Sequence, residues 1–141
     1  MAVRFAIQCH TMPEGVHFDL LIAAGPRPGS PKRDSSRFGG PLATWRLEKL
    51  PTDLAAGESL PATALPDHRA IYLSYEGRVS GGRGSVAPAD AGECVILLRT
   101  QDLWMVELSG RRVRGRFTLR RLDGTSWSLS AGGDCPTPRE A

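Results

Sequence analysis

The sequence lacks the long hydrophobic segment that a membrane-spanning helix requires, since no apolar run approaches about 20 residues. Its first segment, Met1–His10, has no apolar core of the kind found in secretory signals, so we expect a cytoplasmic protein with no membrane partner. Cysteine is sparse: Cys9, Cys94 and Cys135 lie far apart and form no C-x-x-C pair. This pattern argues against a disulfide scaffold and is typical of reduced thiols.

Several nucleotide-binding and hydrolase motifs are also missing. The chain has no G-x-x-x-x-G-K-[ST] loop, no G-x-G-x-x-G that opens a helix and no G-x-S-x-G. These absences disfavour P-loop and dinucleotide-binding α/β folds, and they disfavour the nucleophile elbow of α/β-hydrolases.

Lysine is scarce, whereas arginine is abundant. Of 18 basic residues only Lys32 and Lys49 are lysine, and the net charge is +3. Arginine offers a planar fork that pairs with phosphate through two hydrogen bonds, so a phosphate or nucleic-acid partner fits this composition. The alternative is a high G+C coding bias, which the abundant alanine, glycine and proline also fit.

The distribution of turn residues predicts short strands rather than long helices, because 16 glycines and 11 prolines are spread along the chain. We expect a mostly β protein, a small closed or partly open β-barrel with little helix. One or two helical turns are expected at Thr52–Glu58. The predicted strands are Met1–His10, His17–Ile22, Leu42–Leu47, Ala70–Tyr75, Cys94–Thr100, Leu103–Ser109, Val113–Arg121 and Trp127–Ser130.

The length of 141 residues suits a single domain. We predict one domain over residues 1–131, with a flexible inserted loop at 25–40 that is rich in proline, glycine and charge. Residues 132–141 are predicted to be a polar tail, and the protein is predicted to be a monomer.

Three polar residues near the N-terminus form a candidate metal site. His17 and Asp19 alternate along a predicted strand and therefore leave it on the same face. His10 ends the preceding strand, and a hairpin between the two strands would bring it to the same place. Two histidines and one carboxylate suit Mn, Zn or Fe and leave positions open for substrate. The alternative is an exposed histidine beside an ordinary strand aspartate.

Other polar features are less specific. His68 follows an aspartate and is either a general acid or phosphate contact, or a surface histidine. Arg83 lies among glycines whose N–H groups could bind an anion. Alternation along one strand places Arg112, Arg114 and Arg116 on one face, which is either a phosphate-binding ridge or a solvated surface.

Together these residues resemble one family, the 3′-phosphoesterase domain of bacterial DNA ligase D and its free-standing relatives. The family's motifs are a strand ending in His, then H-[YF]-D, a small residue before Trp with a Lys four residues on, D-H-x-x-x-Y-x-x-[FY]-E-G, a glycine turn, and a glycine-punctuated end. They are matched by His10, His17-Phe18-Asp19, Thr44-Trp45 with Lys49, Asp67-His68 with Tyr72 and Tyr75-Glu76-Gly77, Gly82-Arg83-Gly84, and Leu108 to Arg121.

The resemblance spans about residues 4–130 and implies a compact β-barrel with a divalent metal, typically manganese. It implies removal of a 3′-ribonucleoside or 3′-phosphate from DNA or primer ends, beside ligase or polymerase repair proteins. By motif position His10, His17 and Asp19 would hold the metal, while His68 and Tyr72 would contact the scissile phosphate.

The chain also departs from the family pattern. The arginine two residues after the motif aspartate is Leu21 here, and the family's N-terminal acidic and basic arm has no counterpart before the first strand. Arg69 or Arg83 are candidates to replace the lost arginine. Matches to basic family positions add candidate phosphate-binding residues, namely Lys49 and Arg121.

Three functions therefore stay open. The first is a weak metal-dependent phosphoesterase acting on nucleic-acid 3′ ends. The second is a degenerate relative that binds DNA ends or a repair partner without cleavage. The third is a metal-binding barrel with a phosphate substrate other than nucleic acid.

Overall fold

Strands dominate the structure, a computed structural model that describes residues 2–24, 42–52, 54–68, 70–79 and 81–132. Within those residues helix is confined to the short 3-10 helix η2, so the predicted fold class is confirmed. The elements are β1 (Ala2–Met12), β2 (Gly15–Ile22), β3 (Leu42–Leu47), β4 (Ser59–His68), η2 (Ala70–Leu73), β5 (Gly77–Arg78), β6 (Ser85–Arg99), β7 (Leu103–Gly110), β8 (Arg114–Asp123) and β9 (Ser126–Ala131).

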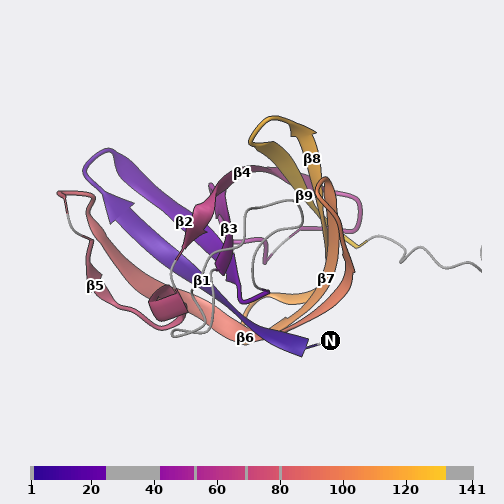
Figure 1. The fold of residues 1–141 in the computed structure, drawn as a ribbon, viewed down its shortest axis with the longest axis horizontal. Helices are drawn as coiled ribbons and strands as arrows, with labels where there is room; N and C mark the ends of the chain where they lie inside the picture. The colour runs from indigo at the N-terminus through magenta and orange to yellow at the C-terminus, as the bar shows by residue number, and fades with distance from the viewer. Residues whose placement is uncertain (1, 25–41, 53, 69, 80, 133–141) are drawn as a thin grey trace, which may run out of the picture.

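The sheet closes on itself (Figure 1). Its strand order is β1-β2-β3-β4-β9-β8-β7-β6-β5, and β6 also pairs with β1. Strand β6 can do this because it is 15 residues long and bonds to β1 along its first part and to β7 along its last. The result is a ring of antiparallel strands without free edges between β1 and β6, as in a small β-barrel.

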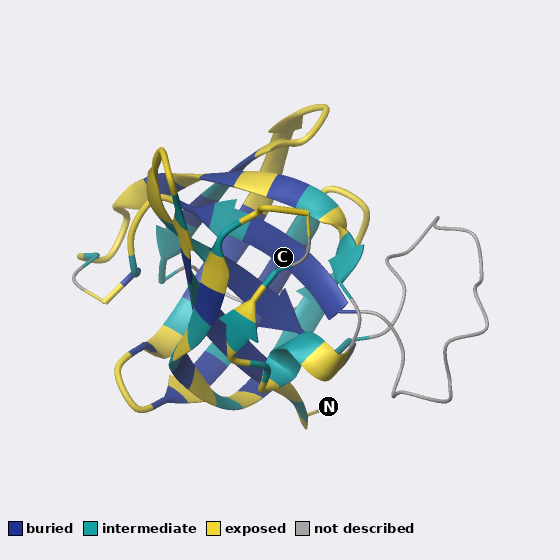
Figure 2. Ribbon diagram, turned by 90° about the vertical axis from the view of Figure 1, so that its left-hand side faces the viewer, coloured by how far each residue is buried: buried dark blue, intermediate teal, exposed yellow. Residues whose placement is uncertain are grey.

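Apolar side chains that alternate along the strands fill the inside of the ring. Figure 2 shows buried and exposed residues alternating along the strands. At the centre, Trp45 meets Trp104 edge to face at 5.0 Å between ring centroids and Trp127 at 5.5 Å. Such aromatic pairs add stability beyond the area they bury. On β1, β2 and β3 every second side chain points into the core. The side chains between them point to the outside of the ring, and these include the polar residues described below.

The predicted hairpin at the N-terminus is confirmed. Strands β1 and β2 pair antiparallel, and His10 lies directly opposite His17. Phe5 and Ile7 of β1 are in the core, so Gln8 and His10 project from the opposite face.

Two local predictions are wrong. The segment Ala70–Tyr75 is not a strand: it begins as η2 and ends in a turn, held by side-chain bonds from β1 that are described below. Thr52–Glu58 forms no helix in its described residues, because Gly57 adopts a φ of 89° and Glu58 closes a turn onto Ala55.

Strand β4 was not predicted, because Pro61 and Pro66 interrupt its pattern. A proline cannot donate to a neighbouring strand, so it is tolerated in strands only at an unpaired edge. Strand β4 pairs with β9 only from Ser59 to Thr63 and with β3 only from Ala62 onward. Pro61 lies before the β3 pairing, and Pro66 lies beyond the β9 pairing, so neither has two paired edges.

Some predictions fall outside the described residues. These are the loop at 25–40, the tail apart from Gly132, the thiol of Cys135 and the candidate phosphate-binding residue Arg69. In the part of the chain that is described, no helix has the length and apolar character needed to span a bilayer.

Candidate metal centre

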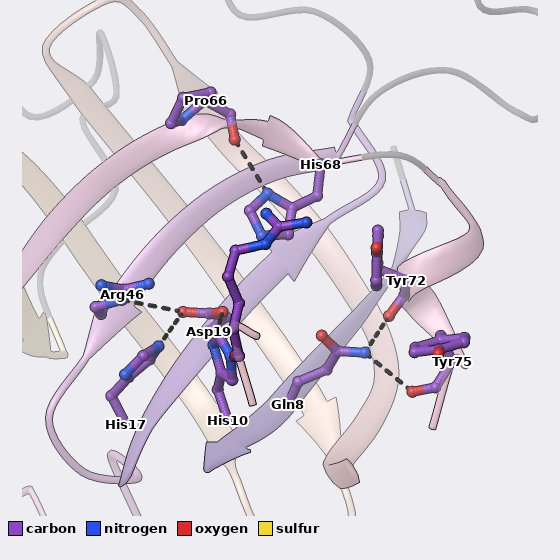
Figure 3. A network of polar contacts seen from close by, with 10 residues as sticks. Gln8, His10, His17, Asp19, Arg46, Pro66, His68, Tyr72 and Tyr75 are labelled. Carbon is purple, nitrogen blue, oxygen red and sulfur yellow. Dashed lines mark hydrogen bonds and ion pairs between the residues drawn. The ribbon is translucent and has the colours of Figure 1, made fainter. Parts of the chain in front are cut away.

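A row of polar residues crosses the outer face of β1, β2 and β3. Asp19 of β2 is the cross-strand partner of both Gln8 on β1 and Arg46 on β3. One step along the hairpin, His10 and His17 form the next same-face pair. Each of these positions alternates with a core position, so all five side chains leave the sheet on its outer face. His10, His17 and Arg46 gather around Asp19, while Gln8 points toward Tyr72 and Tyr75 (Figure 3).

The predicted metal-ligating residues converge. One ligand atom from each of His10, His17 and Asp19 lies within 4.8 Å of the others. The Nδ1 of His10 is 3.8 Å from Asp19 Oδ2, and the Nε2 of His17 is 3.7 Å from Asp19 Oδ1. These separations are too long for hydrogen bonds but suit atoms that share a cation at about 2.0–2.2 Å each.

Burial without hydrogen-bond partners supports this interpretation. His10 Nδ1, His17 Nε2 and Asp19 Oδ1 are buried and make no hydrogen bond. A buried polar atom without a partner costs about 1–3 kcal/mol, so such atoms are rarely left in a native site unless something else satisfies them. A cation would accept a lone pair from all three. This group could therefore hold a metal ion.

The backbone near the glycine turn sets the tautomer of His10. Its Nε2 lies 2.6 Å from the carbonyl oxygen of Arg83, which can only accept, so Nε2 carries the hydrogen. The lone pair is then on Nδ1, the atom that faces Asp19. Gly84 allows this approach, because its φ is 82° and a Cβ there would overlap the backbone carbonyl of Thr11.

The surroundings of His17 favour its neutral form, the form in which an imidazole can bind a metal. Burial lowers the pKa of His17 most, and the charge of Arg46 lowers that pKa further. Asp19 opposes both effects but does not outweigh them. A neutral imidazole has the lone pair that a cation needs, whereas an imidazolium does not.

A cleft of about 370 Å³ opens over this centre. That volume is within the range of small-molecule sites. His68 and Tyr72, both predicted from the sequence, line it together with Arg83. His68 Nδ1 lies 3.1 Å from the Pro66 carbonyl oxygen, and its ring packs edge to face on Tyr72 at 5.8 Å. Because the Pro66 carbonyl oxygen can only accept, His68 Nδ1 carries a hydrogen. Nε2 is then the ring nitrogen that this contact leaves available (Figure 3).

Gln8 ties η2 to the centre, and the sequence analysis did not single it out. This side chain is 2% exposed, and its Nε2 donates to the carbonyl oxygens of Tyr72 at 2.7 Å and Tyr75 at 3.1 Å. The sequence did offer a signal: Gln8 lies two residues before His10 on the same strand, so its side chain leaves the strand on the same face as His10. The bonds curl the Ala70–Tyr75 segment over the cleft, which explains why it is not a strand.

We expect Gln8→Ala to lower the free energy of unfolding by about 2 kcal/mol, because two carbonyl oxygens lose their buried donor. Hydrogen exchange should quicken first at residues 70–75. Gln101→Ala is the control, since Gln101 is exposed in the β6–β7 turn. If residues 70–75 exchange at the same rate in both variants, the Gln8 hydrogen bonds do not hold this segment.

Two predicted phosphate-binding residues lie elsewhere. Lys49 lines a separate cavity with Leu50 and Leu54. Arg121 donates to Asp102 Oδ1 at 3.1 Å and to the Gly124 carbonyl at 2.8 Å, at the β8–β9 turn. Neither lines the cleft over the metal centre.

The arginine-rich strand β8 fits the alternative of a solvated surface. Arg112, predicted to belong to this strand, lies in the turn before β8 and is exposed, as is Arg114. Arg116 donates to Glu107 Oε2 at 2.8 Å. Ion pairs of this exposed kind contribute little stability.

Leu21 cannot be replaced in place by the family's arginine without cost, because it has no exposed area. A guanidinium there would be buried without a partner. Arg46 does line the cleft, and the sequence analysis missed it. Its signal was available: it is the charged residue of the otherwise uncharged strand Leu42–Leu47.

Comparison with known proteins adds no family assignment: no protein-family model matches the chain, and a search among curated proteins found no match.

Proposed function

We propose that this protein is a metal-dependent phosphoesterase that acts on the 3′ ends of nucleic acid in DNA repair. In this proposal it is a divergent relative of the 3′-phosphoesterase domains of bacterial DNA ligase D. The observation that carries the proposal is the set of buried, unsatisfied ligand atoms on His10, His17 and Asp19 beneath a cleft that His68 and Tyr72 line.

His10, His17 and Asp19 would hold a divalent cation, which we propose to be manganese. The donor set of two imidazoles and one carboxylate suits Mn²⁺ and also Zn²⁺. When bound, the cation supplies positive charge against a phosphate and activation of water. The protein contributes the geometry: the β1–β2 register fixes His10 opposite His17, and the Arg83 carbonyl orients the His10 ring.

His68 is the residue we assign to proton transfer. Its Nδ1 is engaged with the Pro66 carbonyl, so Nε2 is the atom available to a substrate oxygen. A protonated Nε2 would donate its proton to the leaving ester oxygen. Tyr72 packs against the His68 ring, and its hydroxyl would donate to a phosphate oxygen in the same cleft.

The cleft and the charge of the chain support a nucleic-acid terminus as substrate. A cleft of about 370 Å³ suits one terminal residue rather than a duplex. The net charge of +3 favours a polyanion over a neutral partner.

The test is a labelled primer–template that ends in a 3′-phosphate or in a single 3′-ribonucleotide, incubated with and without Mn²⁺. We expect end trimming only with the metal, because without the cation the site of His10, His17 and Asp19 supplies neither positive charge for the phosphate nor an activated water. His68→Ala should reduce the rate by roughly 10²- to 10⁴-fold, the usual contribution of acid catalysis.

Binding without trimming would favour the second candidate function, a non-catalytic protein that binds DNA ends. The burial of Leu21 favours that candidate, since the family's arginine is missing from this position. Protein that binds Mn²⁺ but neither cleaves nor binds the primer would contradict both functions.

A further inference from the structure

Arg46 reaches into the metal centre from β3 (Figure 3). It is the cross-strand partner of Asp19, and it lines the same cleft as His68 and Tyr72. Its side chain as a whole is 40% exposed, yet its Nε is buried. Arg46 therefore has a buried Nε at the site, although its side chain as a whole is partly exposed.

The buried Nε–H has no acceptor. It lies 3.7 Å from Asp19 Oδ1, beyond hydrogen-bond distance, and makes no other hydrogen bond. A metal cation would satisfy the lone pairs of His10, His17 and Asp19, but it cannot satisfy an N–H donor. The fourth unsatisfied atom of the centre needs an oxygen acceptor, and a second anion beside Asp19 would balance the added cation.

We propose that Arg46 is the phosphate-binding arginine of this centre, donating to the non-bridging oxygens of a phosphate ester bound beside the metal. This assignment rests on the proposed function. A guanidinium suits the task because its planar fork matches two phosphate oxygens and keeps its charge at any physiological pH.

The assignment also explains how a chain with leucine at position 21 can bind phosphate. Leu21 is buried on β2, two residues beyond Asp19, whereas Arg46 lies opposite Asp19 on the adjacent strand. The positive charge thus enters the same outer face from β3 instead of from β2. Arg83 also lines the cleft, and its backbone carbonyl accepts from His10 Nε2. Arg46 differs from it in lying directly opposite Asp19 in the β2–β3 pairing.

The experiment titrates inorganic phosphate into the full chain loaded with Mn²⁺ and measures affinity by calorimetry. We expect Arg46→Gln to weaken phosphate binding by roughly 10- to 100-fold, the size of a lost charge-assisted hydrogen bond. Arg46→Lys should lose less, because it keeps the charge but not the fork. Arg120→Gln is the matched control, since it removes the same charge from an exposed position outside the cleft.

Mn²⁺ affinity separates this role from a structural one. Arg46→Gln should bind Mn²⁺ as tightly as the wild type or more tightly, because a cation beside Asp19 opposes the metal. Loss of Mn²⁺ binding together with phosphate binding would overturn the assignment and make Arg46 a support for Asp19.

The remaining outcomes distinguish this inference from the proposed function. Equal phosphate affinity in wild type and Arg46→Gln overturns the assignment, even if the wild type trims primers. Phosphate binding that depends on Arg46 in a protein that trims no primer supports the assignment and contradicts the phosphoesterase. Wild type that binds Mn²⁺ but no phosphate overturns the assignment as well.

Discussion

Asp19→Asn is expected to weaken Mn²⁺ binding by about 10²-fold or more while the ring of strands stays folded. Asp19 is 2% exposed, and its two oxygens face His10 and His17 at 3.8 and 3.7 Å. The amide keeps the shape of the side chain but loses the negative charge that a hard divalent cation requires. Calorimetric titration with Mn²⁺ measures the effect, and circular dichroism checks the fold.

Metal-dependent stability gives a second readout of the same change. A ligand that binds only the folded protein stabilises it by about 2.7 kcal/mol at a hundredfold excess over its dissociation constant. Mn²⁺ should therefore raise the melting temperature of the wild type and not that of Asp19→Asn. Asp102→Asn is the control, because Asp102 is an exposed carboxylate paired with Arg121. If Mn²⁺ stabilises Asp19→Asn and the wild type equally, the metal lies elsewhere.

Asp90→Ala is expected to lower the free energy of unfolding by about 3 kcal/mol, among the largest effects of a single substitution. The Asp90 carboxylate is 5% exposed and accepts four backbone N–H groups at the β7–β8 turn and on its own strand. The donors are Ala91 at 2.9 Å, Arg111 at 2.8 Å, Arg112 at 3.0 Å and Val113 at 2.7 Å. Alanine leaves them without an acceptor, and urea unfolding measures the loss.

Gly110 belongs to the same arrangement. A Cβ at Gly110 would overlap the Asp90 carboxylate, so the turn closes around this side chain only because the residue is glycine. The carboxylate thus joins β6 to the β7–β8 turn at a point where the turn itself offers its N–H groups inward.

The contribution of Asp90 should depend on pH with a defined sign. Burial acts to raise the pKa of Asp90, but the four backbone hydrogen bonds outweigh it and hold that pKa below the ordinary 3.8. The unfolded state then binds more protons than the folded state between the two pKa values, so stability rises with pH there. The stabilisation is complete above pH 3.8 and is lost as the pH falls through the folded pKa.

The difference between wild type and Asp90→Asn should accordingly shrink in strong acid. Glu93→Gln, on the same strand and exposed, should show no such dependence. A difference that stays constant down to pH 2 would mean that Asp90 acts through its shape rather than through its charge.

Alternation along the chain was enough to predict much of the fold and the clustering of His10, His17 and Asp19. Phe18, Leu20 and Ile22 alternate with His17 and Asp19, and a two-residue period leaves a strand only one way to bury its apolar side. A short polar turn then brings His10 opposite His17. Because the alternation and the hairpin involve only neighbouring segments, both could be predicted from the sequence.

Contacts between distant segments decided the rest. Gln8 shapes η2 from 64 residues away, and the Arg83 carbonyl orients His10 from 73 residues away. Arg46 meets Asp19 only because β3 pairs with β2 in this register, and Lys49 faces another cavity although it follows closely on the same segment. Periodicity assigns a residue to a face of its own strand, whereas the neighbouring strand and its register depend on closing the whole ring.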